Sequence, residues 1–212
     1  MNEKEFQKAI KNPLFRQNFI DKIDLAESAP YIESISYIPL HYRYILMDTN
    51  HPKRGILTKN KKIKSTINIY PLSFSREQHF LYQDFLSSLL DHEGHHAKEF
   101  YFHTNRIRLN FNIKSIAESL LEKILDGKNE KLKKEAISLI YLYKQEIRAD
   151  TVQLLKAKSR GISQEYKQTV EIRKQKTIDA LKSLESFYNQ SKLQAFNNFL
   201  QFTALQEDFL KF

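Results

Sequence analysis

Residues 92–96 read His92-Glu93-Gly94-His95-His96 and satisfy the zinc-site pattern H-E-x-x-H. On a helix, His92 and His96 lie about one turn apart on one face, so both imidazole rings can bind the same metal ion. Glu93 lies beside them and can take a proton from a metal-activated water. The motif therefore predicts two metal ligands, His92 and His96, and a general base, Glu93.

The sequence around this motif predicts one long helix over residues 76–103. Ser75 and Gln78 have the spacing of a capping box, and apolar residues follow at helical spacing. The face of this helix that carries the histidines also carries Phe85 and Leu89, so we expect the histidines to point inward. The alternative is a surface histidine cluster that binds no metal.

A second helix is predicted over residues 130–158, and two acids, Glu146 and Asp150, interrupt its apolar face. Asn129 can cap the start of this helix, and Gly161 follows its end. A buried acid is costly unless it is paired or bound to a metal. We expect Glu146 to be the third metal ligand and Asp150 to accept the free ring N–H of a ligand histidine. The alternative is that both acids pair with lysine or arginine on a partly solvated face.

The sequence HEGHH at 92–96, followed by EIRAD at 146–150, resembles the paired motifs of the gluzincin zinc metallopeptidases, including small soluble minigluzincin-like peptidases. The resemblance implies a peptidase that binds one Zn²⁺ per chain through His92, His96 and Glu146. It also implies that Glu93 is the general base of peptide hydrolysis and that Asp150 orients a ligand histidine.

This resemblance covers residues 54–155 when the preceding strands are included. It implies that the strand at 66–70 borders the cleft and pairs with an extended peptide substrate. Two positions depart from the family pattern, because Asp91 and Lys98 stand where these families usually carry uncharged or apolar residues.

A peptidase also needs a donor to the oxyanion that forms during hydrolysis. Tyr143, three residues before Glu146 on the same face, is our candidate catalytic residue for this role. His103 and Tyr166 are further candidates. The simpler interpretation of Tyr143 is a packing residue.

The order of the predicted elements defines an α+β fold. We expect a small N-terminal β-sheet packed on the H-E-x-x-H active-site helix, followed by a mainly α-helical C-terminal part. The expected strands are 31–38, 42–47, 56–58 and 66–70. The expected helices are 3–11, 14–27, 76–103, 109–126, 130–158, 163–189 and 191–211. We predict a single metallopeptidase-like domain over 1–212, with the sheet and metal helix in 31–103 and a helical subdomain in 108–212.

Composition excludes several classes of protein. The chain of 212 residues contains no cysteine, which excludes disulfides and thiolate metal sites. It has no apolar run long enough to span a membrane, and residues 1–5 are too polar to begin a signal peptide. We expect a cytoplasmic protein without a membrane span.

The chain carries a formal net charge of +9, and basic residues are concentrated in residues 53–64. Such patches can bind nucleic acid or acidic partners, although solvated surface is the simpler interpretation. The tract has no interleaved aromatic residues of the kind that form a single-strand-binding platform. We therefore expect a peptide or protein substrate and favour nucleic acid less.

The alternative to a peptidase is a basic nucleic-acid- or protein-binding module with a structural or vestigial metal site. A fourth protein ligand, either Glu99 or His95, would close such a site to water. A di-iron helical bundle is a weaker alternative, because a second Glu-x-x-His is missing from the sequence.

Overall fold

A computed structural model of the chain describes residues 2–40, 45–52, 62–102 and 129–189. The chain divides into two compact units. Unit 1 comprises Met1–Ile107 and Ala149–Glu171, and unit 2 comprises Arg108–Arg148 and Ile172–Phe212. The segment Ala149–Glu171 therefore groups with the sheet and with the helical region over 82–102 that carries the H-E-x-x-H motif, which we call the metal helix after its predicted role.

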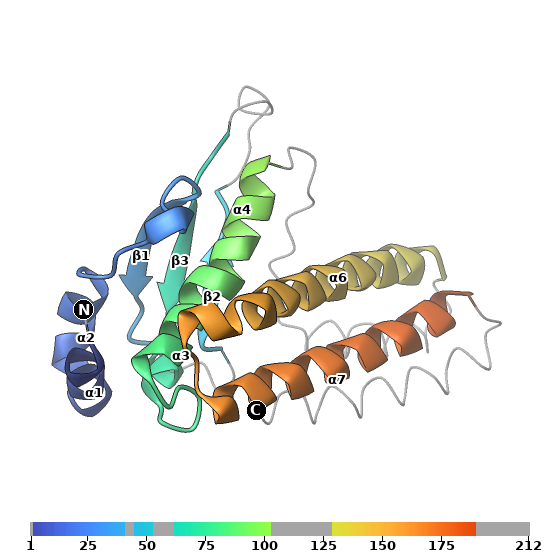
Figure 1. Cartoon of the computed structure of the whole chain (residues 1–212). Helices are drawn as coiled ribbons and strands as arrows, with labels where there is room; N and C mark the ends of the chain where they lie inside the picture. Colours follow the sequence, from blue (N-terminus) through green and yellow to red (C-terminus); the bar gives the residue numbers. More distant parts are fainter. Residues whose placement is uncertain (1, 41–44, 53–61, 103–128, 190–212) are drawn as a thin grey trace. The chain divides into compact units, whose positions relative to one another are not determined.

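The described elements follow the expected order of a sheet and then long helices (Figure 1). The helices are α1 (Glu3–Lys11), α2 (Arg16–Ile20), α3 (Tyr82–Leu86), α4 (Gly94–Phe102), α6 (Asn129–Arg160) and α7 (Gln164–Asn189). A π-helical segment, Ser87–Glu93, joins α3 to α4, and short 3-10 turns occupy Pro13–Phe15, Ala26–Ser28 and Pro71–Phe74. The strands are β1 (Ile32–Tyr37), β2 (Met47–Asn50) and β3 (Ser65–Ile69). The protein is thus an α+β protein, as the sequence predicted.

The three strands form a mixed sheet in the order β1-β3-β2. β1 pairs with β3 in parallel, and β2 pairs with β3 antiparallel. Since β3 has a partner on both sides, it has no free edge for an extended peptide. The expectation that the strand at 66–70 pairs with a substrate is wrong, and among the described strands the two at the edges of the sheet are β1 and β2.

The second strand also differs from its expected position. The sequence favoured 42–47, whereas β2 runs over Met47–Asn50. Its bounds follow from the antiparallel register with β3, in which Met47 lies opposite Ile69 and Asn50 opposite Thr66. Strand propensity is weak beside such pairing contacts. The expected strand 56–58 and the expected helices 109–126 and 191–211 lie outside the described residues.

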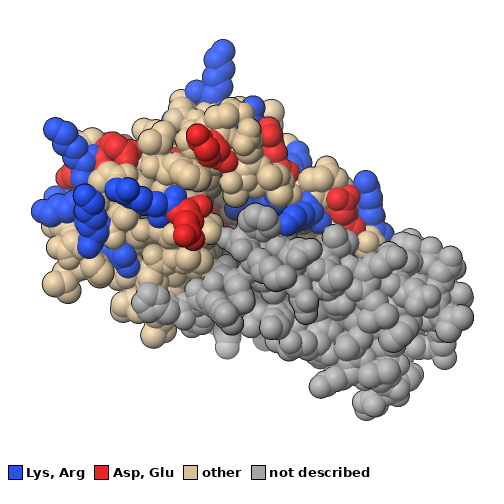
Figure 2. Space-filling view, turned by 90° about the horizontal axis from the view of Figure 1, so that it is seen from below, with Lys and Arg blue, Asp and Glu red and all other residues tan. Residues whose placement is uncertain are grey.

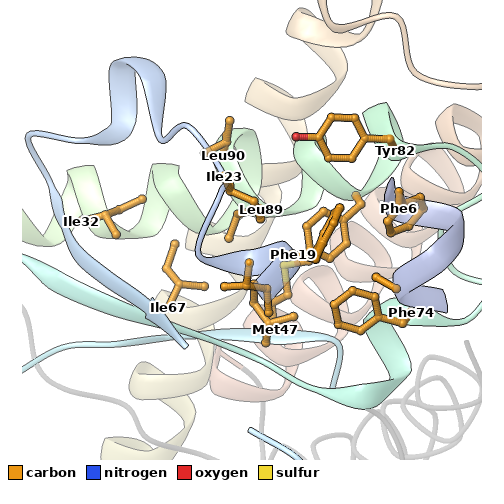
Figure 3. Close-up of a cluster of buried hydrophobic side chains, with 14 of the residues drawn as sticks. Phe6, Phe19, Ile23, Ile32, Met47, Ile67, Phe74, Tyr82, Leu89 and Leu90 are labelled. Carbon is orange, nitrogen blue, oxygen red and sulfur yellow. The ribbon is translucent and has the colours of Figure 1, made fainter. Parts of the chain in front are cut away.

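In the core of unit 1 the metal helix and the N-terminal helices pack against one another and against the sheet (Figure 3). Leu89 and Leu90 of the π-helical segment are buried with Ile67 of β3. Phe6 of α1 and Phe19 of α2 extend this core, with ring centroids 5.8 Å apart. Burying side chains of this size stabilises the fold by about 1.5–3 kcal/mol each, so the core holds the metal helix firmly.

The metal helix starts later than expected. Ser75 caps only a turn, in which its Oγ accepts the Glu77 N–H at 3.2 Å. The helix begins after Leu81, whose N–H donates to Asp84 Oδ2 at 2.8 Å. The prediction of a helix from residue 76 is therefore wrong by about two turns. The region over 82–102 is helical as expected.

The long helices α6 and α7 match the expected 130–158 and 163–189 closely. Gly161 ends α6 in the left-handed region, with φ of 71°, and its N–H donates to the Ala157 carbonyl at 3.0 Å. Ser163 then caps α7, since its Oγ accepts the Tyr166 N–H at 3.1 Å. Both boundaries follow ordinary capping chemistry.

The described residues of unit 2 belong to α6 and α7. Leu139 and Tyr143 of α6 and Leu184 of α7 are buried, and Lys144 forms an ion pair with Glu185 at 2.7 Å. Within the described ranges, none of the helices combines the length and the apolar character that crossing a membrane requires.

Candidate metal centre

His92, His96 and Glu146 come together in the structure. One ligand atom from each residue lies within 4.8 Å of the ligand atoms of the other two. The two imidazole rings stand almost perpendicular, with centroids 5.0 Å apart. Two ring nitrogens and a carboxylate oxygen at this spacing can hold a divalent cation, and this donor set suits zinc.

Asp150 fixes the orientation of the first histidine. Its Oδ1 lies 3.0 Å from His92 Nδ1, and its side chain is 1% exposed. An acceptor at Nδ1 holds the proton on that nitrogen, so Nε2 is the ring nitrogen that can bind a metal. Glu146 lies one turn before Asp150 on α6, so the same helix supplies a ligand and the group that orients another ligand.

A π-helical turn immediately precedes the end of the motif. The segment Ser87–Glu93 includes His92 and Glu93, and regular α-helix resumes at Gly94. A π turn bonds residue i to i+5 and is frequent at functional sites. It rotates the residues after it relative to those before it, which no regular helical periodicity in the sequence could predict.

Gly94 allows the metal helix to approach the turn at Ala26–Ser28. A Cβ at Gly94 would lie 2.7 Å from Ser28 Oγ and 3.4 Å from Ser28 Cβ. The same hydroxyl donates to the Leu90 carbonyl at 3.3 Å. The small residue inside the motif is therefore explained by packing.

Glu93 has a hydrogen-bond donor that the sequence did not indicate. Thr49 Oγ1, on the edge strand β2, lies 2.7 Å from Glu93 Oε2 and 3.1 Å from the Glu93 carbonyl oxygen. The glutamate is buried, with 9% exposed. Thr49 therefore holds one carboxylate oxygen in place next to His92. Neither spacing nor composition around Thr49 marks this role.

Asp91, one of the two departures from the family pattern, has a structural partner. Its carboxylate accepts two hydrogen bonds from Arg160, at 3.0 Å to Nε and 2.7 Å to Nη2. These bonds raise the pKa of Arg160 above its ordinary value, so the guanidinium stays charged. Lys156 Nζ lies 3.5 Å from Asp91 and also forms an ion pair with Glu27. This ion-pair cluster ties the last turns of α6 to the metal helix.

A buried chain of hydrogen bonds fixes α6 and α7 to the same helix. Gln153 Nε2 donates to Tyr166 Oη at 2.8 Å, Tyr166 bonds to Ser88, and Ser88 Oγ lies 2.8 Å from His79 Nε2. His79 Nδ1 lies 2.7 Å from the Ser73 carbonyl, which can only accept. All protons along the chain can thus point one way, toward the Ser73 carbonyl.

Among the other candidate residues, His95 and Glu99 do not belong to the ligand group. His95 Nε2 lies 3.6 Å from Glu99 Oε1, so these two residues face each other, and neither belongs to the group of His92, His96 and Glu146. The Tyr166 hydroxyl is engaged in the buried chain just described. Tyr143 is buried one turn before Glu146, and its role as oxyanion donor stays a prediction. His103 lies outside the described residues.

Comparisons of the chain with models of protein families, with curated proteins and with solved structures find no match. Among the described residues, the group of His92, His96 and Glu146 could hold a metal ion, and this group is the starting point for a functional proposal.

Proposed function

We propose that this protein is a zinc-dependent peptidase of gluzincin type. The observation that carries the proposal is the convergence of His92, His96 and Glu146 within 4.8 Å of one another. The donor set of two histidines and one glutamate is that of several catalytic zinc sites, which keep a position open for water. Asp150 supports the proposal, because a carboxylate behind a ligand histidine is the usual arrangement in such sites.

A bound zinc ion would supply Lewis-acid chemistry, which lowers the pKa of water and polarises a carbonyl group. Glu93 then has the acid–base role. Its carboxylate follows His92 directly in the chain, and Thr49 holds one of its oxygens. The carboxylate takes a proton from water and delivers it to the leaving amine. Tyr143 remains our candidate donor to the oxyanion.

The substrate in this proposal is a peptide or protein, and the proposed location is the cytoplasm. The competing function is a binding module whose metal site is structural. The two functions differ at Glu93, because a structural site needs no general base.

The test is the substitution Glu93→Gln, which keeps the size of the side chain but cannot take a proton near neutral pH. We expect zinc content and melting temperature to stay close to those of the wild type. Cleavage of a broad peptide library, read by mass spectrometry, should fall by about 10²–10⁴-fold. Glu77→Gln is the matched control, since Glu77 is exposed and lies outside the ligand group, and it should cleave like the wild type.

Two outcomes would overturn the proposal. Equal cleavage by the wild type and Glu93→Gln would show that the activity belongs to a contaminant. A zinc-loaded wild type that cleaves nothing in the library would favour the binding module.

A further inference from the structure

Three aromatic side chains from distant parts of the sequence form one cluster in unit 1. Tyr31 precedes β1, whereas Tyr101 and Phe102 end α4. The ring centroid of Tyr31 lies 5.4 Å from that of Tyr101 and 5.5 Å from that of Phe102, and the last two are 5.3 Å apart. We call these three residues the aromatic cluster. Each ring meets the other two at a steep angle, a geometry typical of stable aromatic contacts.

Two lysines lie over these rings. Lys62 Nζ lies 5.6 Å from the ring centroid of Tyr101 and 5.4 Å from that of Phe102. Lys98 Nζ lies 5.8 Å from the ring centroid of Tyr31. These distances are within the range of cation–π attraction. Both lysines are exposed, so each ammonium group can reach an anion in solvent while its stem covers the aromatic surface.

The cluster is accessible from solvent. Phe102 is 51% exposed, and Tyr31 and Tyr101 are partly exposed. The acids nearest along the chain are Glu33, which is exposed on β1, and Glu99, which lies next to Lys98 and faces His95. The surroundings of the rings therefore combine exposed aromatic area with two lysines that lie directly over it.

Charge alone does not single out this place. On the face shown in Figure 2, acidic side chains lie among the basic ones. Lysines also lie over a single ring elsewhere, since Lys8 and Lys22 are 4.3 Å and 6.0 Å from the ring centroid of Phe15. What distinguishes the aromatic cluster is that three rings gather beneath two lysines and that one of these rings, Phe102, is half exposed. Stacking rings beside positive charge are what many proteins use to bind single-stranded nucleic acids. Bases stack on the rings without strong sequence preference, and ammonium groups contact the phosphates.

We propose that the aromatic cluster, with Lys62 and Lys98, binds single-stranded nucleic acid. A base stacks on the exposed ring of Phe102, and the two lysines contact the adjoining phosphates. An anionic membrane surface fits less well, because interfacial binding needs a broad apolar face and Phe102 alone is half exposed among the three rings. This inference goes beyond the proposed peptidase and does not depend on a metal.

The test is a fluorescence-anisotropy titration of the full-length protein with a short labelled oligo(dT) strand at several salt concentrations. We expect Phe102→Leu, which keeps apolar bulk but removes the ring, to weaken binding about tenfold. Lys62→Gln should weaken binding and reduce the slope of log affinity against log salt by about one. Lys4→Gln is the matched control, because Lys4 is an exposed lysine on α1, far from the end of α4 (Figure 1), and it should bind like the wild type.

The proposal fails if Phe102→Leu binds like the wild type, or if the matching duplex binds as tightly as the single strand. It also fails if vesicles with anionic phospholipids bind the protein and the oligonucleotide does not. Circular-dichroism melting of each variant verifies folding. His96→Ala, which lacks a proposed zinc ligand, should bind the strand like the wild type. A failure of the nucleic-acid proposal can therefore be distinguished from a failure of the proposed peptidase function.

Discussion

The two ring nitrogens of His92 have different tasks in the candidate metal centre. Asp150 Oδ1 lies 3.0 Å from Nδ1, which leaves Nε2 for the metal. Because the Asp150 side chain is almost completely buried, water does not replace the histidine as its partner. The orientation of the ligand ring thus depends on one carboxylate.

For substitutions of single residues in the candidate metal centre, we predict a graded loss of zinc affinity. Glu146→Ala removes a proposed ligand and should abolish most binding. Asp150→Ala removes only the orienting carboxylate and should lower affinity by about 10–100-fold. Asp150→Asn keeps an acceptor without the charge and should fall between Asp150→Ala and the wild type.

Competition with a chromophoric zinc chelator measures these affinities. Glu185→Ala removes an exposed acid that is paired with Lys144, and it should not change zinc binding. Wild-type affinity in Glu146→Ala would mean that another acid is the ligand, and Glu99 would be the first to examine.

Among the elements, α6 has the central role because it carries Glu146, Asp150, Gln153 and Arg160. The last three contact the metal helix or its buried hydrogen-bond chain. Asp150 and Arg160 lie about 15 Å apart along the helix axis, so two separated contacts hold the register of this segment. A shift of one residue would break both contacts.

We predict that Asp91→Asn destabilises the protein strongly. The substitution leaves Arg160 without its charged partner, and breaking a buried ion pair typically costs about 3–5 kcal/mol. Glu27→Gln is the control, because Glu27 also pairs with α6 but is 65% exposed, and it should change stability by about 0.5 kcal/mol or less.

Urea denaturation measures the free energy of unfolding of both variants. The contribution of Glu27 to stability also depends on pH. Hydrogen bonding to Lys156 lowers the pKa of Glu27, so its small contribution is present above the ordinary pKa and is lost as the pH falls through the lowered value. Similar small effects of Asp91→Asn and Glu27→Gln would contradict the structural role of Asp91.

For the whole molecule, metal binding should be coupled to folding stability. The proposed ligands lie on the metal helix and on α6, and a zinc ion would bind the folded chain in preference to the unfolded chain. At free zinc about 100 times the dissociation constant, binding adds about 2.7 kcal/mol. We therefore predict that a chelator lowers the melting temperature by roughly 5–10 °C in a chain of this length.

Differential scanning fluorimetry with and without zinc tests this coupling. His96→Ala should melt at the same temperature in both conditions, since it lacks a ligand. If zinc raised the melting temperature of the wild type and of His96→Ala equally, the stabilising zinc would bind at another site.

Local signals in the sequence were enough for the α+β class, the long helices and the candidate ligands. The caps of α6 and α7 are made by residues within one turn, such as Gly161 and Ser163. The spacing within 92–96, and the two acids on an otherwise apolar helix face, likewise involve residues close in sequence. Short-range geometry of this kind follows from helical periodicity.

Contacts between distant segments decided the features of the fold and of the site that local signals did not predict. Pairing with β3 set the bounds of β2 and left no free edge on β3. At the start of the metal helix, the Tyr82 N–H donates to Glu3 Oε2 of α1 at 2.7 Å. Arg160 lies 69 residues from Asp91, and Thr49 lies 44 residues from Glu93.

The aromatic cluster shows the same limit of sequence reasoning. Residues 53–64 looked unsuited to nucleic acid because no aromatic residues interrupt them. The fold brings Tyr31, Tyr101 and Phe102 next to Lys62 of that tract. Periodicity along one segment carries no information about which other segment will pack against it, so only tertiary packing could produce this surface.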